Sequence, residues 1–455
     1  MAELVTVVGA GLAGSECALQ LAARGHDVRL YEQRPQHASP AHHTAGPAEL
    51  VCSNSFKARR TGSAAGLLKS ELWTMGSFLL EAALDTSVPA GGALAVDREA
   101  FSARVAELIA AEPRIEVVHE RVDAVPEGPC VIAAGPLCAD ELFGDIADRV
   151  GGEGMSFFDA AAPIVDATTL DMGVVFSASR YDDEGAGDYL NCPMTREEYE
   201  TFLGELLSAK RTIGHDFEQS DLFCACQPVE EVAKTGHDAL RFGALKPVGL
   251  TDPRTGTRPW AVVQLRAENR DRTAYNLVGF QTNLTWPEQR RVFRMIPGLK
   301  DAEFFRYGVM HRNSFVDSPR VLDATFALPG TQVRLAGQIT GTEGYTEAIA
   351  SGLLAALNTH AQLAGLDAVA LPRTGALGSL VAYATDPQTS PYQPMHVNFG
   401  LVPPLEGKRL RKRERYAAYA RRAREDLDAY LATRGDLSLP VRQSAWEEVA
   451  GDGAQ

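Results

Sequence analysis

The N-terminal part of the chain alternates short apolar runs with a glycine-rich stretch and a helical pattern. Leu4–Val8 is a mostly β-branched run, which is typical of a buried parallel strand. Gly9–Gly14 follows directly, and an alanine- and leucine-rich stretch then predicts a helix from Ser15 to about Arg24. Asp27–Tyr31 predicts a second strand. These patterns together predict a β–α–β unit.

The glycine spacing in this unit matches that of dinucleotide-binding loops. Gly9 permits a tight turn, Gly11 lets the backbone approach a pyrophosphate, and Gly14 allows the helix to pack closely on the strand. The helix N-terminus would face the phosphates, and an acid at the end of the second strand would accept a ribose hydrogen bond. The expected nucleotide contacts are Gly9, Ala10, Gly11, Leu12, Ala13, Gly14 and Glu32.

A second part of the same fold is expected much later in the chain. Residues 332–337 predict a strand that ends in a glycine turn, and Thr346 to Leu357 predicts a helix rich in small residues. Val131–Pro136 predicts a further internal strand. In two-segment flavoproteins such a strand, loop and helix close the flavin site, so Gly337 and Gly341 join the expected cofactor contacts.

The stretch between these two parts has a different pattern of turn residues and predicts an inserted domain. The predicted fold class is α/β: an FAD-binding Rossmann-like domain of two segments, residues 1–160 and 306–455, with an inserted α+β domain at 161–305. The sequence has no second GxGxxG motif, so we expect no dedicated NAD(P)H-binding Rossmann domain. FAD is therefore favoured over NAD as the nucleotide bound at the first motif.

Composition supports a globular protein of several domains. Of the 455 residues, 45% are hydrophobic and 23% are charged, which is ordinary for soluble proteins and argues against disorder or a coiled coil. No run of 18 apolar residues predicts a transmembrane helix. The N-terminus lacks a basic leader, and seven cysteines in so long a chain argue against a disulfide framework. We therefore expect a cytoplasmic protein with reduced thiols.

Charge is unevenly distributed along the chain. The formal net charge is −15, yet residues 408–424 contain nine basic residues and one acid. Such a local excess of positive charge is typical of a polyanion-binding site, although a solvated C-terminal helix would show the same pattern. If the partner is RNA, the first candidates for phosphate contact are Arg411, Lys412 and Arg413.

Three positions suggest chemistry, and each has an ordinary structural alternative. Cys52 follows the second strand in a polar loop, but free cysteines are more often small buried hydrophobes. Cys224 and Cys226 form a CxC pair, yet a closed zinc site needs four ligands and no second pair lies nearby, so we expect no metal. His311 could stack on a heterocycle beside a flavin or serve as a hydrogen-bonded structural histidine.

The chain resembles the folate- and FAD-dependent tRNA uracil-5-methyltransferase family (TrmFO) over nearly its whole length. The motifs that carry the resemblance follow in order: Gly9–Gly14, His42-His43-Thr44, Ala48–Ser55, Val88–Arg98, Tyr189–Met194, Cys226–Glu231, Arg241–Leu250, Gln264-Leu265-Arg266, Gly279–Asn283, His311-Arg312-Asn313, Leu335–Ser351 and Tyr392–Pro404. Because the match is spread over so many ordered motifs, it is more specific than a likeness of fold.

The resemblance implies a reaction and a set of residues. Cys226 falls on the family's nucleophile, which adds to uracil C6, and Cys52 falls on its second catalytic cysteine, to which we assign removal of the C5 proton. His311 would stack on the folate pterin, and Tyr345 would lie at the flavin edge. The implied cofactors are FAD, 5,10-methylenetetrahydrofolate as one-carbon donor, and NADH or NADPH as reductant. The implied product is 5-methyluridine at position 54 of the tRNA T-loop.

The sequence departs from the family pattern at a few positions. Cys224-Ala225 replaces the usual Glu-Gly, which adds a second thiol beside Cys226, and His396 replaces the usual Asn. Ala45 and Pro47 alter the loop that follows His43. Three other functions stay open: the longer flavin- and folate-dependent modifier of tRNA wobble uridine, a plain FAD oxidoreductase acting on a small substrate, and a tRNA-binding flavoprotein without catalytic activity.

Overall fold

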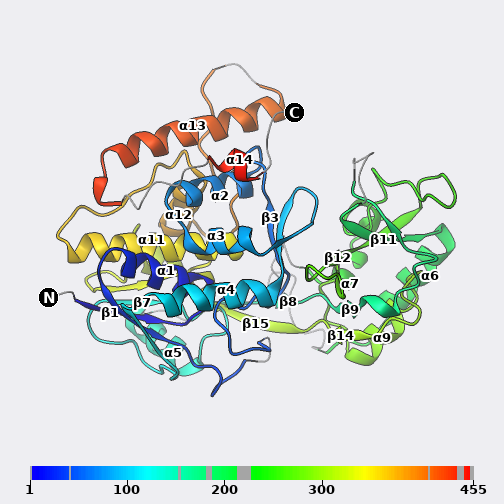
Figure 1. The fold of residues 1–455 in the computed structure, drawn as a ribbon, viewed down its shortest axis with the longest axis horizontal. Helices are drawn as coiled ribbons and strands as arrows, with labels where there is room; N and C mark the ends of the chain where they lie inside the picture. The colour runs from blue at the N-terminus through cyan, green and yellow to red at the C-terminus, as the bar shows by residue number, and fades with distance from the viewer. Residues whose placement is uncertain are drawn as a thin grey trace.

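The chain folds into two lobes, which Figure 1 shows side by side. The structure, a computed structural model, describes residues 3–39, 42–151, 155–180, 187–212, 227–407, 410–437 and 445–450. The N-terminal and C-terminal parts of the chain form the left-hand lobe together, and the middle part forms the right-hand lobe. Each lobe has its own hydrophobic core; the larger core contains residues from Val5 to Ile146 and from Phe315 to Trp446, and the smaller one residues from Val165 to Ala302.

A five-stranded parallel sheet lies at the centre of the left-hand lobe. The strands run in the order β16 (Val333–Leu335), β7 (Cys130–Ile132), β1 (Leu4–Val8), β2 (Asp27–Tyr31) and β6 (Ile115–Val118). All four neighbouring pairs are parallel. The central strand β1 is rich in valine and buries Val5, Val7 and Val8, as expected for a strand covered on both faces.

Two long helices pack together against this sheet. Helix α1 (Leu12–Ala23) follows β1, and α11 (Tyr345–Leu363) comes from the far end of the chain. A Cβ atom on Gly352 would lie 2.1 Å from the carbonyl oxygen of Ala13, so only glycine allows this approach. The other helices of this lobe are α2 (Ala64–Thr74), α3 (Phe78–Asp85), α4 (Arg98–Ala111), α5 (Asp140–Val150), α10 (Ser318–Val321), α12 (Ala376–Thr385), α13 (Lys412–Ala432) and α14 (Trp446–Ala450).

The same lobe also contains a small antiparallel sheet. Its strands run in the order β3 (Ser55–Ala58), β5 (Ala93–Val96) and β4 (Ser87–Val88). Helix α4 begins directly after this sheet, capped by the side chain of Asp97, which accepts a hydrogen bond from the amide of Ala100. Since β3 directly follows the loop that contains Cys52, this sheet fixes one end of that loop.

The right-hand lobe contains a six-stranded antiparallel sheet. Its strands run in the order β10 (Phe176–Ser177), β11 (Tyr189–Met194), β12 (Ala261–Ala267), β13 (Ala274–Leu277), β9 (Ile164–Asp166) and β14 (Phe304–Arg306). All seven residues of β12 are buried, and the strand pairs with β11 on one side and, at Leu265–Ala267, with β13 on the other. The helices of this lobe are α6 (Arg196–Ser208), α7 (Val229–Lys234), α8 (Ala239–Phe242) and α9 (Trp286–Phe293).

A two-stranded ribbon connects the lobes. Its strands, β8 (Met155–Ala160) and β15 (Met310–Phe315), pair antiparallel and lie between the lobes in Figure 1. The chain enters the right-hand lobe after β8 and leaves it before β15. A segment inserted between two neighbouring strands is the arrangement expected of an inserted domain.

The elements largely agree with the sequence patterns, but the bounds of the two long helices differ from those predicted. Helix α1 begins at Leu12 rather than Ser15, because Gly11 has the extended backbone of an N-cap residue and the helix begins directly after it. Helix α11 begins at Tyr345, after Gly344 at φ +119°, and continues six residues beyond the predicted end at Leu357. Both glycine-rich turns are therefore shorter than the sequence suggested.

Candidate active site

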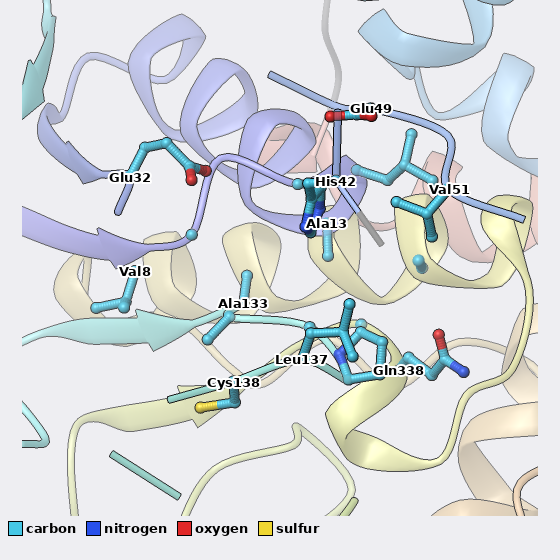
Figure 2. A pocket seen from close by; sticks show the side chains of 18 of the residues that line it. Val8, Ala13, Glu32, His42, Glu49, Val51, Ala133, Leu137, Cys138 and Gln338 are labelled. Carbon is cyan, nitrogen blue, oxygen red and sulfur yellow. The ribbon is translucent and has the colours of Figure 1, made fainter. Parts of the chain in front are cut away.

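A cavity of about 270 Å³ opens at the carboxyl ends of β1, β2, β7 and β16. Doubly wound sheets bind their ligands at this edge. Figure 2 shows side chains that surround the cavity from several segments, among them Ala13 of α1, Glu49 and Val51 of the loop after β2, and Gln338 of the turn after β16. Residues from both ends of the chain therefore form one site.

The three glycines of the first loop have different surroundings. A Cβ atom on Gly9, at φ +97°, would lie 2.6 Å from the carbonyl oxygen of Ala133, and one on Gly14 would lie 1.8 Å from that of Gly9. A Cβ atom on Gly11 would have no atom within 4 Å, and Gly11 lines the cavity. Gly9 and Gly14 are thus required for packing, whereas Gly11 leaves space open for a ligand.

The N-terminus of α1 offers hydrogen-bond donors to this space. No side chain caps the helix, and its first turn contains no acidic residue. The first amides of a helix have no partner within the helix, so an uncapped N-terminus attracts anions. Leu12 and Ala13 both line the cavity at this point. A phosphate group fits this position.

Glu32 is held in place by four hydrogen bonds. One of its oxygens accepts from the amide of Ala10 at 3.0 Å, and its carboxylate also accepts from the amide, Nε and Nη2 of Arg34. Burial alone would raise the pKa of Glu32, but the hydrogen bonds and charge of Arg34 lower it below its ordinary value. The carboxylate is therefore ionised. A ribose hydroxyl that donates to it would bind beside the donors from Ala10 and Arg34.

Arg34 also orders the loop that follows β2. Its Nη1 lies 3.1 Å from Glu49, whose carboxylate accepts hydrogen bonds from the amides of His43 and Thr44. Burial, together with the neighbouring charge of Arg34, lowers the pKa of His42 to about 4, so this cavity-lining histidine is neutral at pH 7. The sequence patterns did not single out Arg34 or Glu49, because their pairing depends on the fold of the loop.

The structure brings Cys52 and Tyr345 together, although they are far apart in the sequence. The hydroxyl of Tyr345 accepts hydrogen bonds from the amides of Cys52 at 2.8 Å and Ser53 at 3.1 Å. The thiol of Cys52 lies 3.6 Å from the carbonyl oxygen of Ala160. Cys52 and Tyr345 both line the cavity, and burial raises the pKa of the tyrosine. Tyr345 thus positions the backbone of the loop that carries the thiol.

Tyr345→Phe is expected to lower the turnover number about tenfold while FAD is retained. Loss of the hydroxyl leaves two amides without their acceptor, at a cost of roughly 1–3 kcal/mol per buried group, so the Cys52 loop loses its fixed position. Steady-state rates and the visible flavin spectrum of the purified variant test this. As a control, Tyr275→Phe changes a tyrosine on β13 of the other lobe. Equal rates in the Tyr345 variant and the wild type would contradict the positioning role.

Asn54 ties the same loop to the right-hand lobe. This fully buried side chain donates hydrogen bonds to the carbonyl oxygens of Val96 and Ala267, and accepts one from Nε of Arg266 at 2.7 Å. Arg98 strengthens the connection, since it pairs with Glu268 and also donates to the carbonyl oxygen of Leu50. The end of β12 is therefore part of the wall behind Cys52.

The glycines of the second segment differ in position. Gly337, at φ +81°, lines the cavity, and its amide donates to the hydroxyl of Ser351 at 2.7 Å. Gly341, at φ +75°, does not line the described cavity: a Cβ atom there would lie 2.3 Å from the hydroxyl of Tyr392. Gly341 therefore serves packing in this structure. Its predicted contact with the cofactor stays a prediction.

Two residues predicted to take part in the chemistry are described incompletely. Cys226 lies outside the described residues, as does Cys224. The next described segment begins at residue 227. Its backbone is held by a hydrogen bond from the amide of Val229 to the carbonyl oxygen of Gln281, at 2.7 Å. The backbone of His311 pairs with Asp159 in the ribbon between the lobes, while its side chain lies outside the described atoms.

The basic segment forms an exposed helix end. Lys408 and Arg409 lie outside the described residues, and α13 begins at Lys412. The side chains of Arg411, Lys412 and Arg413 are all exposed, and Figure 1 shows α13 on the left-hand lobe. This exposure agrees with both interpretations of the charge, RNA contact and a solvated helix, so the contact with RNA stays a prediction.

The described part of the chain contains no cluster of three or more His, Cys, Asp or Glu side chains that could hold a metal ion. Among the same residues, every helix is too short or too polar to cross a membrane.

A family model described as glucose inhibited division protein A matches residues 4–367. The methylenetetrahydrofolate–tRNA-(uracil-5-)-methyltransferase TrmFO of Geobacter sulfurreducens is 54% identical over 95% of this chain and 100% of its own. The enzyme of the same name from Ligilactobacillus salivarius is 51% identical over 93% of this chain and 97% of its own.

A solved structure shows the same fold. The GidA protein of Aquifex aeolicus superposes with a TM-score of 0.67, over 98% of this chain and 75% of that chain, at 16% sequence identity. At this identity the likeness concerns the fold alone. It confirms the predicted fold class, a Rossmann-like α/β architecture with a parallel sheet.

Proposed function

This chain belongs to the methylenetetrahydrofolate–tRNA-(uracil-5-)-methyltransferase (TrmFO) family, and from that premise we propose how its cavity and cysteines carry out the reaction. It is a folate-dependent enzyme that methylates C5 of uracil in tRNA. The observation that carries this conclusion is identity of about half of all residues over nearly the full length of both chains. The finer proposal is that the product is 5-methyluridine at position 54 of the T-loop, made in the cytoplasm.

The cavity fits FAD. Its pyrophosphate would lie at the uncapped N-terminus of α1, where the missing side chain of Gly11 leaves room and the amides of Leu12 and Ala13 are available. Glu32 would face the ribose, and Gly337 and Tyr345 would contact the ring system at the other end. Bound FAD, reduced by NADH or NADPH, supplies the hydride that takes the one-carbon unit of methylenetetrahydrofolate to the level of a methyl group.

The cysteines supply the chemistry on the uracil. C5 of uracil is a poor nucleophile, and addition of the Cys226 thiolate to C6 makes C5 reactive toward the one-carbon unit. After the new carbon–carbon bond forms, a base must remove the C5 proton so that the bond between C6 and sulfur can break. We assign this base to Cys52, whose thiol lines the cavity in a loop fixed by Tyr345 and Asn54.

His311 is proposed to stack on the folate. Its backbone lies on the ribbon that connects the lobes, and the paired strand β8 ends at Ala160, whose carbonyl oxygen contacts the Cys52 thiol. His311 pairs with Asp159, the residue before Ala160, so its backbone lies near the wall of the cavity. A planar imidazole at this position would hold a pterin against the cavity that FAD occupies.

A methylation assay tests the function. The purified holoenzyme should methylate an unmodified T-loop transcript only when methylenetetrahydrofolate and NADH or NADPH are both present. A transcript with cytidine at position 54 should not react. Oxidation of NAD(P)H by the flavin without methyl transfer would instead support a plain oxidoreductase, and tRNA binding without either reaction would support a binding protein.

Neutralising the start of α13 is expected to weaken tRNA binding about tenfold. Replacing Arg411, Lys412 and Arg413 with Gln removes up to three phosphate contacts, so the slope of log K against log salt concentration should fall by about two. Fluorescence anisotropy with labelled tRNA at several salt concentrations measures both quantities. The matched control replaces three surface arginines elsewhere on the same lobe, the half-buried Arg104 and the exposed Arg149 and Arg320. If both triple variants change the tRNA affinity and the salt slope equally, α13 makes no specific contact with tRNA and is a solvated helix.

A further inference from the structure

A second cavity, of about 500 Å³, lies in the right-hand lobe and combines cations with aromatic rings. Its wall includes Arg196 of α6, Arg241 and Phe242 of α8, Lys246, Arg258 and Trp260. Four of these six side chains are positively charged, in a chain whose formal net charge is −15. Arg241–Leu250 was one of the motifs of the family resemblance, and nothing in the reaction described above uses it.

The two aromatic residues of this cavity have different surroundings: Trp260 contacts arginines, and Phe242 is exposed. The guanidinium of Arg241 lies 3.6 Å from the ring centre of Trp260, and that of Arg196 lies 5.3 Å from it, so the indole supports both cations. Phe242 is different, because 82% of its surface is exposed. An exposed phenylalanine at the edge of a cationic cavity offers a flat face on which a base can stack.

The charges are only partly neutralised by the protein. Arg241 pairs with the half-buried Asp238 at 3.0 Å, and Arg196 pairs with the exposed Glu200 at 2.7 Å. Lys246 and Arg258 are exposed, and neither has a carboxylate partner among the residues that the structure describes. The cavity therefore retains positive charge for an anionic partner.

The cavity is rigidly connected to the active site. Trp260 directly precedes β12, and its amide donates to the carbonyl oxygen of Met194 at 3.0 Å. The other end of the strand, Ala267, accepts the hydrogen bond from Asn54 beside Cys52. At about 3.3 Å per residue, seven residue steps place the cavity roughly 23 Å from the Cys52 loop. A polyanion that extends from the active site for this distance would reach the cavity.

We infer that this cavity is a second RNA-binding site, which holds backbone phosphates and one unstacked base of the same tRNA whose uracil reacts beside Cys52; this inference rests on the proposed function. Lys246 and Arg258 bind phosphates as exposed cations, and the arginines beside Trp260 extend the charged surface. Phe242 stacks on the base. In Figure 1, α6 and α13 lie on different lobes, so this contact and that of α13 would hold one tRNA across both lobes.

A double variant, Lys246→Gln with Arg258→Gln, tests the phosphate contacts in the holoenzyme. We expect the KM for tRNA to rise about tenfold and the salt slope of tRNA binding to fall by about 1.5, with kcat at saturating tRNA, bound FAD and the KM for folate unchanged. The matched control changes the same charge outside the cavity, with Lys300→Gln and Arg149→Gln. Identical KM values and salt slopes for the two double variants would overturn the inference.

Phe242 tests the base contact separately. Phe242→Ala should raise the KM for tRNA about fivefold to tenfold, and Phe242→Tyr should keep the wild-type value, since a tyrosine ring also stacks on a base. A raised KM for NADH or NADPH, with that for tRNA unchanged, would show a dinucleotide site and contradict the inference. If the wild type itself fails to methylate tRNA, the proposed function fails instead, and direct tRNA binding by the same variants still decides the inference.

Discussion

Replacing Cys226 with Ala is expected to abolish methylation and also the covalent adduct with a T-loop that contains 5-fluorouracil at the target position. The thiolate that adds to C6 is the first bond-forming group on the uracil, so its loss should reduce the rate more than about a thousandfold. Fluorine at C5 blocks proton removal, and therefore traps the adduct wherever the thiolate can still add. Gel electrophoresis of protein and labelled RNA measures the adduct directly.

The neighbouring thiol provides the control for this prediction. Cys224 is two residues from Cys226, so Cys224→Ala should keep both methylation and adduct, and the double variant should match Cys226→Ala. A free thiol with a pKa of about 8.5 is only a few per cent ionised at pH 7, so the attacking cysteine needs a stabilising group near it. If Cys224→Ala is inactive and Cys226→Ala active, the two roles must be exchanged.

Cys52→Ala separates the two cysteine roles. We expect turnover to stop, because no base removes the C5 proton, while the fluorinated adduct still forms. Loss of the adduct as well would place Cys52 at an earlier step of the reaction.

Gly11→Val is expected to remove bound FAD without unfolding the protein. The backbone of Gly11, at φ −71° and ψ −170°, is allowed for any L-residue, and no protein atom lies within 4 Å of the added Cβ. The new methyl groups would occupy the space in front of the α1 N-terminus, where we propose that the pyrophosphate binds. Less than a tenth of the wild-type flavin should remain after purification, by visible absorbance.

Gly14→Val is the matched variant, and we expect it to destabilise the fold itself. Its Cβ would lie 1.8 Å from the carbonyl oxygen of Gly9, so the strand and helix must separate, at a cost of about 3 kcal/mol or more. The thermal midpoint of Gly14→Val should fall well below that of wild-type protein stripped of FAD. The thermal midpoint of Gly11→Val should equal that of the stripped wild type. Stoichiometric FAD in Gly11→Val would contradict the binding mode.

The sequence predicted the elements that depend on local patterns. β1, α1 and β2 follow from a β-branched run, a glycine spacing and an alanine-rich stretch, all within about 30 residues. The start of α1 was misplaced by three residues, because Gly14 looks like a loop residue in sequence although it belongs to the first turn. Cys52 was a candidate from its polar loop and Tyr345 from the family resemblance, and the structure joins them through the hydrogen bond from the Cys52 amide to the Tyr345 hydroxyl.

The rest of the site depends on contacts that no local pattern records. Arg34 and Glu49 form an ion pair only after the loop between them has folded back. Asn54 was part of a family motif, but its partners lie on β5 and β12, in two different sheets. The cationic cavity of the right-hand lobe combines three separate stretches of sequence: Arg196, residues 241–248 and residues 258–260. Each stretch alone is an ordinary basic or aromatic surface segment.

The contacts of the Cys52 loop also have a consequence for the order in which the protein folds. The loop is held by Arg266, 212 residues from Asn54, and by Tyr345, 293 residues from Cys52. Contacts of such sequence separation require closure of very large loops, and they form slowly. The Cys52 loop therefore acquires its structure only after both lobes and the C-terminal segment that carries Tyr345 are in place. During synthesis, a ribosome must release most of the chain before the Cys52 thiol is positioned.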